Sequence, residues 1–346
     1  MRLGVSLGFS GAKISIDLDF VRAVEDAGFD SLWTAEGYGS DAVSPCAWAL
    51  AATKRIKCGT AIMQMSARTP TMAAMTAQTL DALSGGRFIL GLGPSGPQVI
   101  EGWYGELYGK PLTRTREYIS IIRKILKREA PLEFDGEIYQ IPNKGLGSTG
   151  LGKPLKSIAH GNPDIPIFTG AFAPAGMRTA AEVADGVFPS FMNPERFDVF
   201  AEPLAQGFAK AGNGKGLGNF AIAPMVHLSI DDDLDKARLP VKQMLALYIG
   251  GMGARGKNFY NDYAKRLGYE AEAVKIQDLY LDGKQSEALA AVPDRLVDEI
   301  ALTGSKDRVR DRLSAWVAAG RENQVTDMLL LSRNIESLRI VAELIG

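Results

Sequence analysis

The chain has 346 residues, of which 46% are hydrophobic and 23% charged, and its formal net charge is −1. This composition is typical of a globular protein, and the balanced charge argues against nucleic acid and anionic membrane surfaces as partners. The N-terminus lacks a signal-peptide pattern and no run approaches about 18 unbroken apolar residues, so we expect a cytoplasmic protein without a membrane span.

Cysteine and histidine, the usual ligands of zinc, are rare in this chain. Cys46 and Cys58 lie in apolar surroundings, and we expect two buried free thiols, as in a reducing cytoplasm. Two cysteines and two histidines scattered through the chain do not form a zinc pattern. The acidic run from Asp231 to Asp235 suits the first turn of a helix, where carboxylates interact favourably with the helix dipole. We therefore predict no metal site.

Strand-like and helix-like segments alternate along the chain. Short apolar runs predict strands at residues 2–8, 31–36, 56–63, 87–93, 166–171, 186–191, 219–230 and 325–332. Apolar residues at helical spacing predict helices at residues 16–27, 47–54, 71–83, 115–127, 175–184, 195–211, 307–320 and 336–345. Two insertions interrupt this order, a loop-rich one at about 131–163 and a mostly helical one at 231–302.

This alternation defines the expected fold. Strands that alternate with helices favour parallel pairing and right-handed crossovers. About eight such units close into a (β/α)8 TIM barrel, here with insertions and as a single domain over residues 1–346. A doubly wound open sheet is the competing architecture.

A glycine-rich stretch raises the question of dinucleotide binding. Residues 91–96 read GLGPSG, which matches the G-x-G-x-x-G fingerprint and follows a predicted strand. Pro94 and Pro97 remove backbone N–H groups, and no long helix follows directly, so the match lacks its required context. In a barrel, the same stretch is the loop after the fourth strand at the mouth, where its glycines let a flat ligand approach the backbone.

Other strand ends offer further candidates. Glu36 could act as a general base or hydrogen-bond a ligand ring, and it could equally be a solvated loop carboxylate. The start of the helix at Ala175 to Met177 suits a phosphate, because helix N-termini attract anions. Arg178 could add charge there or lie outside in solvent. The pattern around His227 favours a strand-facing histidine over a catalytic one, and Met63 and Met65 by themselves suggest core filling.

Two segments carry a family resemblance. They are residues 20–42 and residues 59–105, the second including an R-x-P, a helix-to-strand passage ending S-G-G-R-F, and the GLGPSGP loop. Through them the chain resembles the bacterial-luciferase-like superfamily. It looks closer to the branch that depends on coenzyme F420, which includes methylenetetrahydromethanopterin reductase, than to the FMN monooxygenases.

The resemblance implies where a cofactor would bind. It implies a ring at the carboxyl ends of the strands, backed by a non-prolyl cis peptide after the third strand, which we expect at Ser66–Ala67. Glu36 matches an acidic position near the ring and is our candidate catalytic residue. The implied cofactor-binding residues are Met63, Gln64, Met65, Ser66, Ala67, Gly93, Pro94, Ser95, Gly96, Gly170, Ala171, Phe172, Pro174, Ala175, Gly176 and Met177.

The resemblance also defines the functional hypotheses. Sugar-phosphate dehydrogenases of the family carry a histidine after the acid, whereas this chain has Gly37, so sugar-phosphate oxidation is not expected. The main hypothesis is an F420-dependent oxidoreductase that transfers a hydride to or from a small organic substrate. The alternatives are an FMN-dependent luciferase-like monooxygenase and a non-catalytic coenzyme-binding protein. Members of the family are often dimers, so we expect a homodimer.

Overall fold

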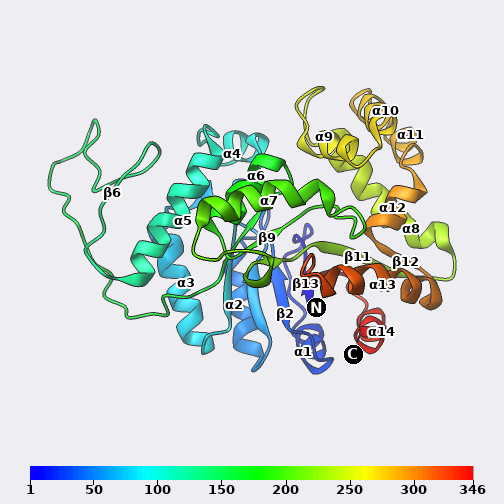
Figure 1. The fold of residues 1–346 in the computed structure, drawn as a ribbon, viewed down its shortest axis with the longest axis horizontal. Coiled ribbons are helices and arrows are strands. Elements are labelled where there is room, and N and C mark those ends of the chain that lie inside the picture. The colour runs from blue at the N-terminus through cyan, green and yellow to red at the C-terminus, as the bar shows by residue number, and fades with distance from the viewer. Residues whose placement is uncertain (346) are drawn as a thin grey trace.

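Parallel strands form a closed ring in the computed structural model, which describes residues 1–345 (Figure 1). Seven strands of the ring are β1 (Arg2–Ser6), β2 (Ser31–Thr34), β3 (Lys57–Thr60), β5 (Phe88–Gly93), β8 (Ile167–Gly170), β9 (Gly186–Phe188) and β13 (Asp327–Leu331). The eighth position is taken by β10 (Ala221–Ile222) and the following β11 (Met225–Ile230). Since β10 pairs with β9 and β11 pairs with β13, this segment closes the ring. The predicted (β/α)8 barrel is confirmed, and the open sheet is excluded.

Helices cover the outside of the ring. They are α1 (Leu18–Asp26), α2 (Val43–Ala52), α3 (Pro70–Ser84), α5 (Pro111–Lys127), α6 (Pro174–Val183), α7 (Asp198–Ala211), α13 (Lys306–Arg321) and α14 (Ile335–Ile345). Several begin where the sequence supplies a capping side chain, as Asp17 does for α1 and Thr69 for α3. None of the helices within residues 1–345 is both long and apolar enough to cross a membrane.

The inside of the ring is filled by its own side chains. Trp33 lies at its centre, with ring centroids 5.9 Å from Phe168 and 5.1 Å from Phe188. These residues belong to an inner core that we define as Trp33, Ala61, Ile89, Phe168, Phe188, Ala223 and Leu329. A Cβ atom on Gly59 would lie 2.5 Å from the Trp33 ring, so glycine is required there. A ligand must therefore bind above this core, at the mouth of the barrel.

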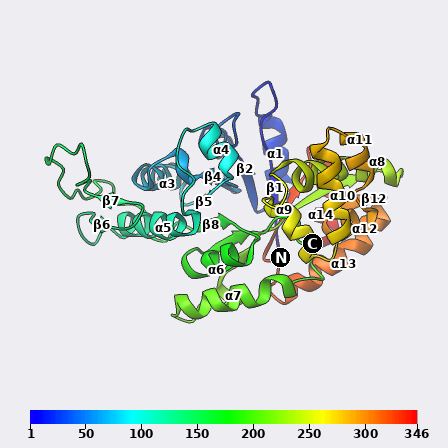
Figure 2. The same cartoon turned by 90° about the horizontal axis from the view of Figure 1, so that it is seen from above.

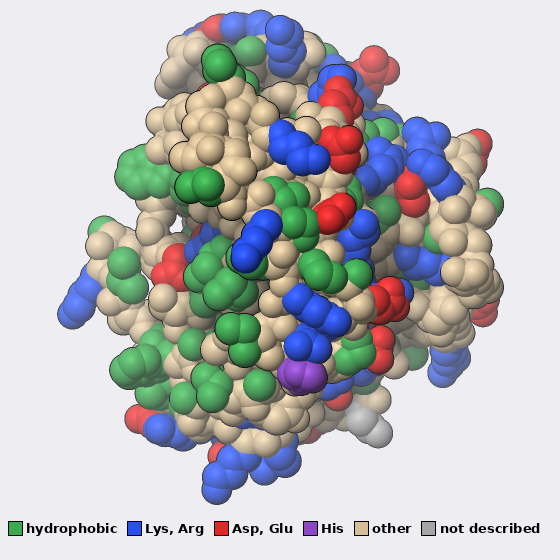
Figure 3. All heavy atoms as spheres, turned by 90° about the vertical axis from the view of Figure 1, so that its left-hand side faces the viewer, with side chains coloured by type: hydrophobic (Ala, Val, Ile, Leu, Met, Phe, Trp, Pro, Cys, Tyr) green, Lys and Arg blue, Asp and Glu red, His purple; other side chains and the backbone are tan. Residues whose placement is uncertain are grey.

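The two insertions lie on opposite sides of the barrel (Figures 1 and 2). The first forms an arm with a small antiparallel hairpin of β6 (Phe134–Asp135) and β7 (Gln140–Ile141). The arm exposes Leu146, Leu151, Leu155 and Ile158. The face from which it projects mixes apolar with basic and acidic side chains (Figure 3).

The second insertion is helical, as expected. Helix α8 (Leu234–Leu245) runs into a π-helical segment, Ala246–Gly251. It is followed by α9 (Phe259–Arg266), α10 (Glu270–Leu281), α11 (Gln285–Ala290) and α12 (Asp294–Ile300). A short strand at its end, β12 (Leu302–Gly304), was not predicted, and it pairs with the distal half of β11. Asp233 caps α8, in keeping with the expected role of the acidic run.

Two predicted strands are broken in the structure. The seventh is interrupted at Ala223–Pro224, because proline cannot donate to a strand ladder. The third ends at Thr60, and the chain pairs again only as β4 (Met63–Gln64), beside β5. Apolar residues run through both breaks, so the hydrophobic pattern hid them. Cys46 and Cys58 are free and buried, which confirms that prediction.

The predicted position of the cis peptide was wrong. The non-prolyl cis bond joins Ala61 to Ile62, not Ser66 to Ala67. Its place is the break between β3 and β4, where the chain leaves the ring and returns to it. Ser66 and Ala67 lie instead in a turn of 3-10 helix, Met65–Ala67, that leads toward α3.

Candidate active site

The break after β3 places Ile62 at the mouth of the barrel. Ile62 is half-buried and packs on the inner core. A Cβ atom on Gly93 would lie 2.7 Å from Ile62 Cδ1, and one on Gly170 would lie 3.5 Å from Ile62 Cγ2. The side chain therefore lies between the ends of β5 and β8, where two glycines leave room for it because they have no side chains. Sequence reasoning missed Ile62, and no local signal distinguished it from the apolar residues around it.

Glu36 is the centre of a buried polar network after β2. Its side chain is only 2% exposed. Oε2 accepts a hydrogen bond from the Ala42 N–H at 2.9 Å, and Oε1 accepts from the Gln64 N–H at 2.6 Å. Arg68 Nη1 donates to the same Oε1 at 2.7 Å. With donors on both oxygens, this carboxylate holds the ends of β2 and β4 together, and its candidate catalytic role stays a prediction.

The Gln64 side chain leaves one acceptor free. Its Nε2 donates to the carbonyl oxygens of Glu36 at 3.3 Å and Gly37 at 3.1 Å. Its Oε1 is buried and has no hydrogen-bond partner within the described part of the chain. An unpaired buried acceptor is costly, so this oxygen is suited to receive a ligand N–H.

The loop after β5 borders the same region. Pro94, Ser95 and Gly96 are half-buried, and Ser95 has a left-handed backbone with φ of 57°. Tyr108 donates its hydroxyl to the Ser95 carbonyl oxygen at 3.4 Å, which ties the loop down. The helix that follows, α4 (Pro97–Gly102), has only six residues. As the sequence indicated, the loop does not lead into the long helix that a dinucleotide fingerprint requires.

The loop after β8 ends in an open helix N-terminus. Helix α6 has no side-chain cap, and its first internal bond runs from the Met177 N–H to the Ala173 carbonyl at 2.9 Å. The N–H groups of Ala175 and Gly176 precede that bond and have no intrahelical acceptor. This arrangement can hold a phosphate. Arg178 is exposed and donates to Gln206 on α7 at 2.7 Å, which fits the outside alternative for its role.

Some residues that were predicted to contact the cofactor have side chains that point away from the mouth. The side chains of Met63, Met65 and Met177 have no exposed area and pack in the layer between the ring and the helices. This placement fits the core-filling interpretation of Met63 and Met65, and it leaves only their backbone to a ligand. Ser66 and Ala67 are half-buried.

His227 faces the mouth from β11. Val226 and Leu228 point into the outer core, so His227 shares the inner face with Met225, which packs on the inner core. His227 Nε2 lies 3.1 Å from Met244 Sδ of α8. Burial lowers the pKa of this imidazole to about 4, so the ring is neutral near pH 7. The expected strand-facing histidine therefore lies on the inner face of the barrel, toward its mouth.

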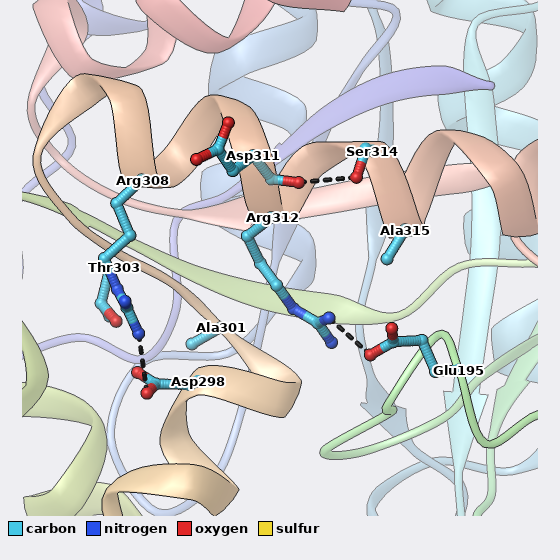
Figure 4. Close-up of a pocket in the computed structure, with 9 residues that line it drawn as sticks. All are labelled: Glu195, Asp298, Ala301, Thr303, Arg308, Asp311, Arg312, Ser314 and Ala315. Carbon is cyan, nitrogen blue, oxygen red and sulfur yellow. Dashed lines mark hydrogen bonds and ion pairs between the residues drawn. The ribbon is translucent and has the colours of Figure 1, made fainter.

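A separate cavity of about 320 Å³ lies beside α12, β12 and α13 (Figure 4). Arg308 pairs with Asp298 at 2.7 Å, and Arg312 pairs with Glu195 at 2.6 Å. These paired charges hold α13 against α12 and the loop after β9. Within residues 1–345, no three His, Cys, Asp or Glu side chains are grouped to hold a metal ion.

Comparisons with known proteins agree with this geometry. A family model described as luciferase-like monooxygenase matches residues 2–323. A Mycobacterium tuberculosis protein, provisionally named a coenzyme F420-dependent oxidoreductase, is 45% identical over 100% of this chain and 99% of its own length. The 5,10-methylenetetrahydromethanopterin reductase of Archaeoglobus fulgidus is 30% identical, with 87% of this chain and 86% of the reductase aligned. The solved coenzyme F420-dependent tetrahydromethanopterin reductase of Methanopyrus kandleri shares the fold, with a TM-score of 0.79 and 24% identity over 99% of this chain and 97% of that one. The chain therefore belongs to the luciferase-like family of oxidoreductases.

Proposed function

We propose that this protein binds coenzyme F420 at the mouth of the barrel and transfers a hydride between it and an organic substrate. The observation that carries the proposed ring position is Ile62, flanked by Gly93 and Gly170, above a filled inner core. The choice of F420 over FMN is supported by the relatives, since the M. tuberculosis protein and the M. kandleri reductase are both named as F420-dependent.

The residues at the mouth fit such a coenzyme. Ile62 offers an apolar surface for one face of a flat ring, and Gln64 Oε1 can accept a hydrogen bond from a ring N–H. The free N–H groups of Ala175 and Gly176 can hold a phosphate. When bound, the deazaflavin would supply a carrier for a hydride, that is, two electrons and one proton, while the protein binds and orients it.

Glu36 has a positioning role in this proposal. Its carboxylate accepts from two backbone N–H groups and from Arg68, so it fixes the loop after β2 against β4. Through Gln64, which follows Ile62 by two residues, it holds the surface on which the ring would lie.

Equilibrium binding tests the proposal. Dissociation constants for F420 and FMN are measured by fluorescence at low and high salt. We expect F420 to bind more tightly, and its affinity to fall with salt because its tail bears carboxylates in addition to the phosphate. Tight FMN binding without F420 binding would overturn the choice of coenzyme and favour the monooxygenase alternative.

A second measurement separates an enzyme from a carrier. The protein loaded with reduced F420 is mixed with a broad panel of organic acceptors, and coenzyme oxidation is followed by absorbance. Oxidation of the coenzyme by at least one acceptor supports hydride transfer, whereas no oxidation by any acceptor of the panel favours the non-catalytic alternative. The homodimer and the cytoplasmic location stay predictions, which sedimentation and cell fractionation test.

A further inference from the structure

Aromatic side chains gather at one side of the barrel mouth. Phe172 follows β8, Phe191 follows β9, and Tyr248 and Tyr260 come from the second insertion; we call these four residues the aromatic wall. The ring centroids of Phe172 and Tyr260 lie 4.8 Å apart at an interplanar angle of 25°. Those of Tyr248 and Tyr260 lie 4.7 Å apart at 90°, and those of Phe191 and Tyr248 lie 5.6 Å apart. The wall joins the strand ends to the insertion.

The aromatic wall does more than pack the second insertion against the barrel. Its neighbour Tyr263 is 1% exposed, stacks on Phe200 and donates its hydroxyl to the Phe191 carbonyl at 3.4 Å, as a structural tyrosine does. All four residues of the wall, by contrast, keep part of their surface accessible. The hydroxyl groups of Tyr248 and Tyr260 make no hydrogen bond to any other residue in the described chain. The wall therefore keeps some accessible surface at the barrel mouth, against which a ligand can pack.

His227 adds a polar group to this wall. Its partner Met244 precedes Tyr248 by four residues on the same helical run, so both side chains reach the barrel from one face. The second ring nitrogen of His227 has no partner within residues 1–345 and can exchange a hydrogen bond with a ligand. The exposed rings of Tyr38, in the loop after β2, and Trp103, at the end of α4, lie 6.5 Å apart.

The aromatic wall itself carries no charged side chain, and the charged side chains that the structure places around the mouth contact other protein groups. Glu36 and Arg68 pair with each other. Arg266 donates to the Phe172 carbonyl at 3.4 Å and lies over the Tyr263 ring. Because burying a charge without an oppositely charged partner is costly, a charged group of the substrate would be poorly matched to the uncharged rings of the wall.

Resting on the proposed function, we propose that the substrate is a flat, uncharged, conjugated molecule that lies against the aromatic wall and offers one polar atom to His227. Aromatic ketones and related conjugated carbonyl compounds have this chemistry. Stacking on the wall supplies contact area, and the single hydrogen bond supplies orientation.

Equilibrium dialysis against the F420-loaded protein tests this proposal, with the coenzyme kept oxidised so that no reaction occurs. The probes are acetonaphthone, naphthoate and ethylnaphthalene, which share the ring system and differ in charge and in the polar atom. We expect acetonaphthone to bind about 10-fold or more tightly than naphthoate, because the carboxylate must be desolvated. Equal or tighter binding of naphthoate would overturn the proposal.

Variants locate the binding surface. Tyr260→Ala should weaken acetonaphthone binding about 10-fold, and Tyr260→Phe should largely preserve it, since the ring provides the contact. Phe259→Ala is the matched control, because Phe259 is the preceding residue on α9 and is 52% exposed. His227→Leu should weaken acetonaphthone about 3- to 10-fold and leave ethylnaphthalene unchanged, as expected for one hydrogen bond.

The F420 dissociation constant and the melting temperature are measured for every variant, so that misfolding is recognised. If F420 binds but Tyr260→Ala matches the wild type, or no naphthalene probe binds, the substrate class is wrong and the proposed function stands. If F420 does not bind to the wild-type protein, both proposals fail.

Discussion

Replacing Gly93 by alanine should weaken coenzyme binding by displacing Ile62. The added Cβ would lie 2.7 Å from both Cδ1 and Cγ1 of Ile62, whereas carbon atoms normally pack at about 3.5–4.0 Å. The φ angle of Gly93 is not positive, so alanine introduces no backbone penalty. The Ile62 side chain must therefore move by about 1 Å toward the mouth.

Overpacking of this kind costs about 1–3 kcal/mol. If the displaced side chain intrudes on the ring site, F420 affinity should fall about 5- to 150-fold, at about 1.4 kcal/mol per factor of ten. The assay is fluorescence titration of F420, with thermal unfolding measured in parallel. Gly102→Ala is the control, because no atom lies within 4 Å of its added Cβ.

A double-mutant cycle makes the test specific. Ile62→Ala removes the atoms that collide with the new methyl group, so Gly93→Ala should cost much less affinity in that background. An unchanged dissociation constant for Gly93→Ala would refute the reasoning. So would a loss of the same size in both backgrounds, because it would mean that Ile62 does not transmit the effect.

Three further predictions concern buried polar groups. Glu36→Gln breaks a buried ion pair with Arg68 and should lower the unfolding free energy in urea by about 3–5 kcal/mol; a change below about 1 kcal/mol would contradict the network. Burial acts to raise the pKa of the Glu25 carboxyl, but backbone N–H groups outweigh burial and lower that pKa. The ionised Glu25 therefore stabilises the fold above the unfolded pKa of about 4.3, and this stabilisation is lost as pH falls through the folded pKa. The difference in unfolding free energy between the wild type and Glu25→Gln should disappear below about pH 4. A difference that stays constant from about pH 7 to 3 would argue against this. Burial lowers the pKa of His227 to about 4. Between about pH 6.5 and 4 the unfolded chain therefore takes up a proton that the folded chain does not, so the unfolding free energy decreases as the pH is lowered across this range. Nitrogen NMR of the two histidine rings should find His227 neutral at pH 6, and a charged ring there would disprove the apolar setting.

The barrel itself was predictable from the sequence. The alternation of short apolar runs with helical segments predicted the ring strands and the helices that cover them, because strand and helix have different hydrophobic periods. The loop 91–96 was correctly separated from a dinucleotide fingerprint, since Pro94 and Pro97 change the local backbone whatever the rest of the chain does. The open start of α6 followed equally from a local loop-to-helix pattern.

The details of the mouth depended on tertiary structure. The apolar run 56–63 gave no sign that the strand breaks at Ala61–Ile62, so the residue that lies between Gly93 and Gly170 was missed and the cis peptide was placed five residues too late. Periodicity reports which face of an element is apolar, and it cannot report which distant element covers that face.

The aromatic wall also depended on tertiary structure rather than on local sequence. The sequence placed Tyr248 and Tyr260 only in a mostly helical insertion, and it implied Phe172 as a cofactor-binding residue without indicating these neighbours. They meet because the π-helical segment Ala246–Gly251 and α9 pack against the loops after β8 and β9, which brings together side chains nearly ninety positions apart. Local sequence determined most of the helices and ring strands of this protein, because each depends mainly on neighbouring residues. Only the closed ring decided which side chains share its mouth, because that depends on contacts between segments far apart in the chain.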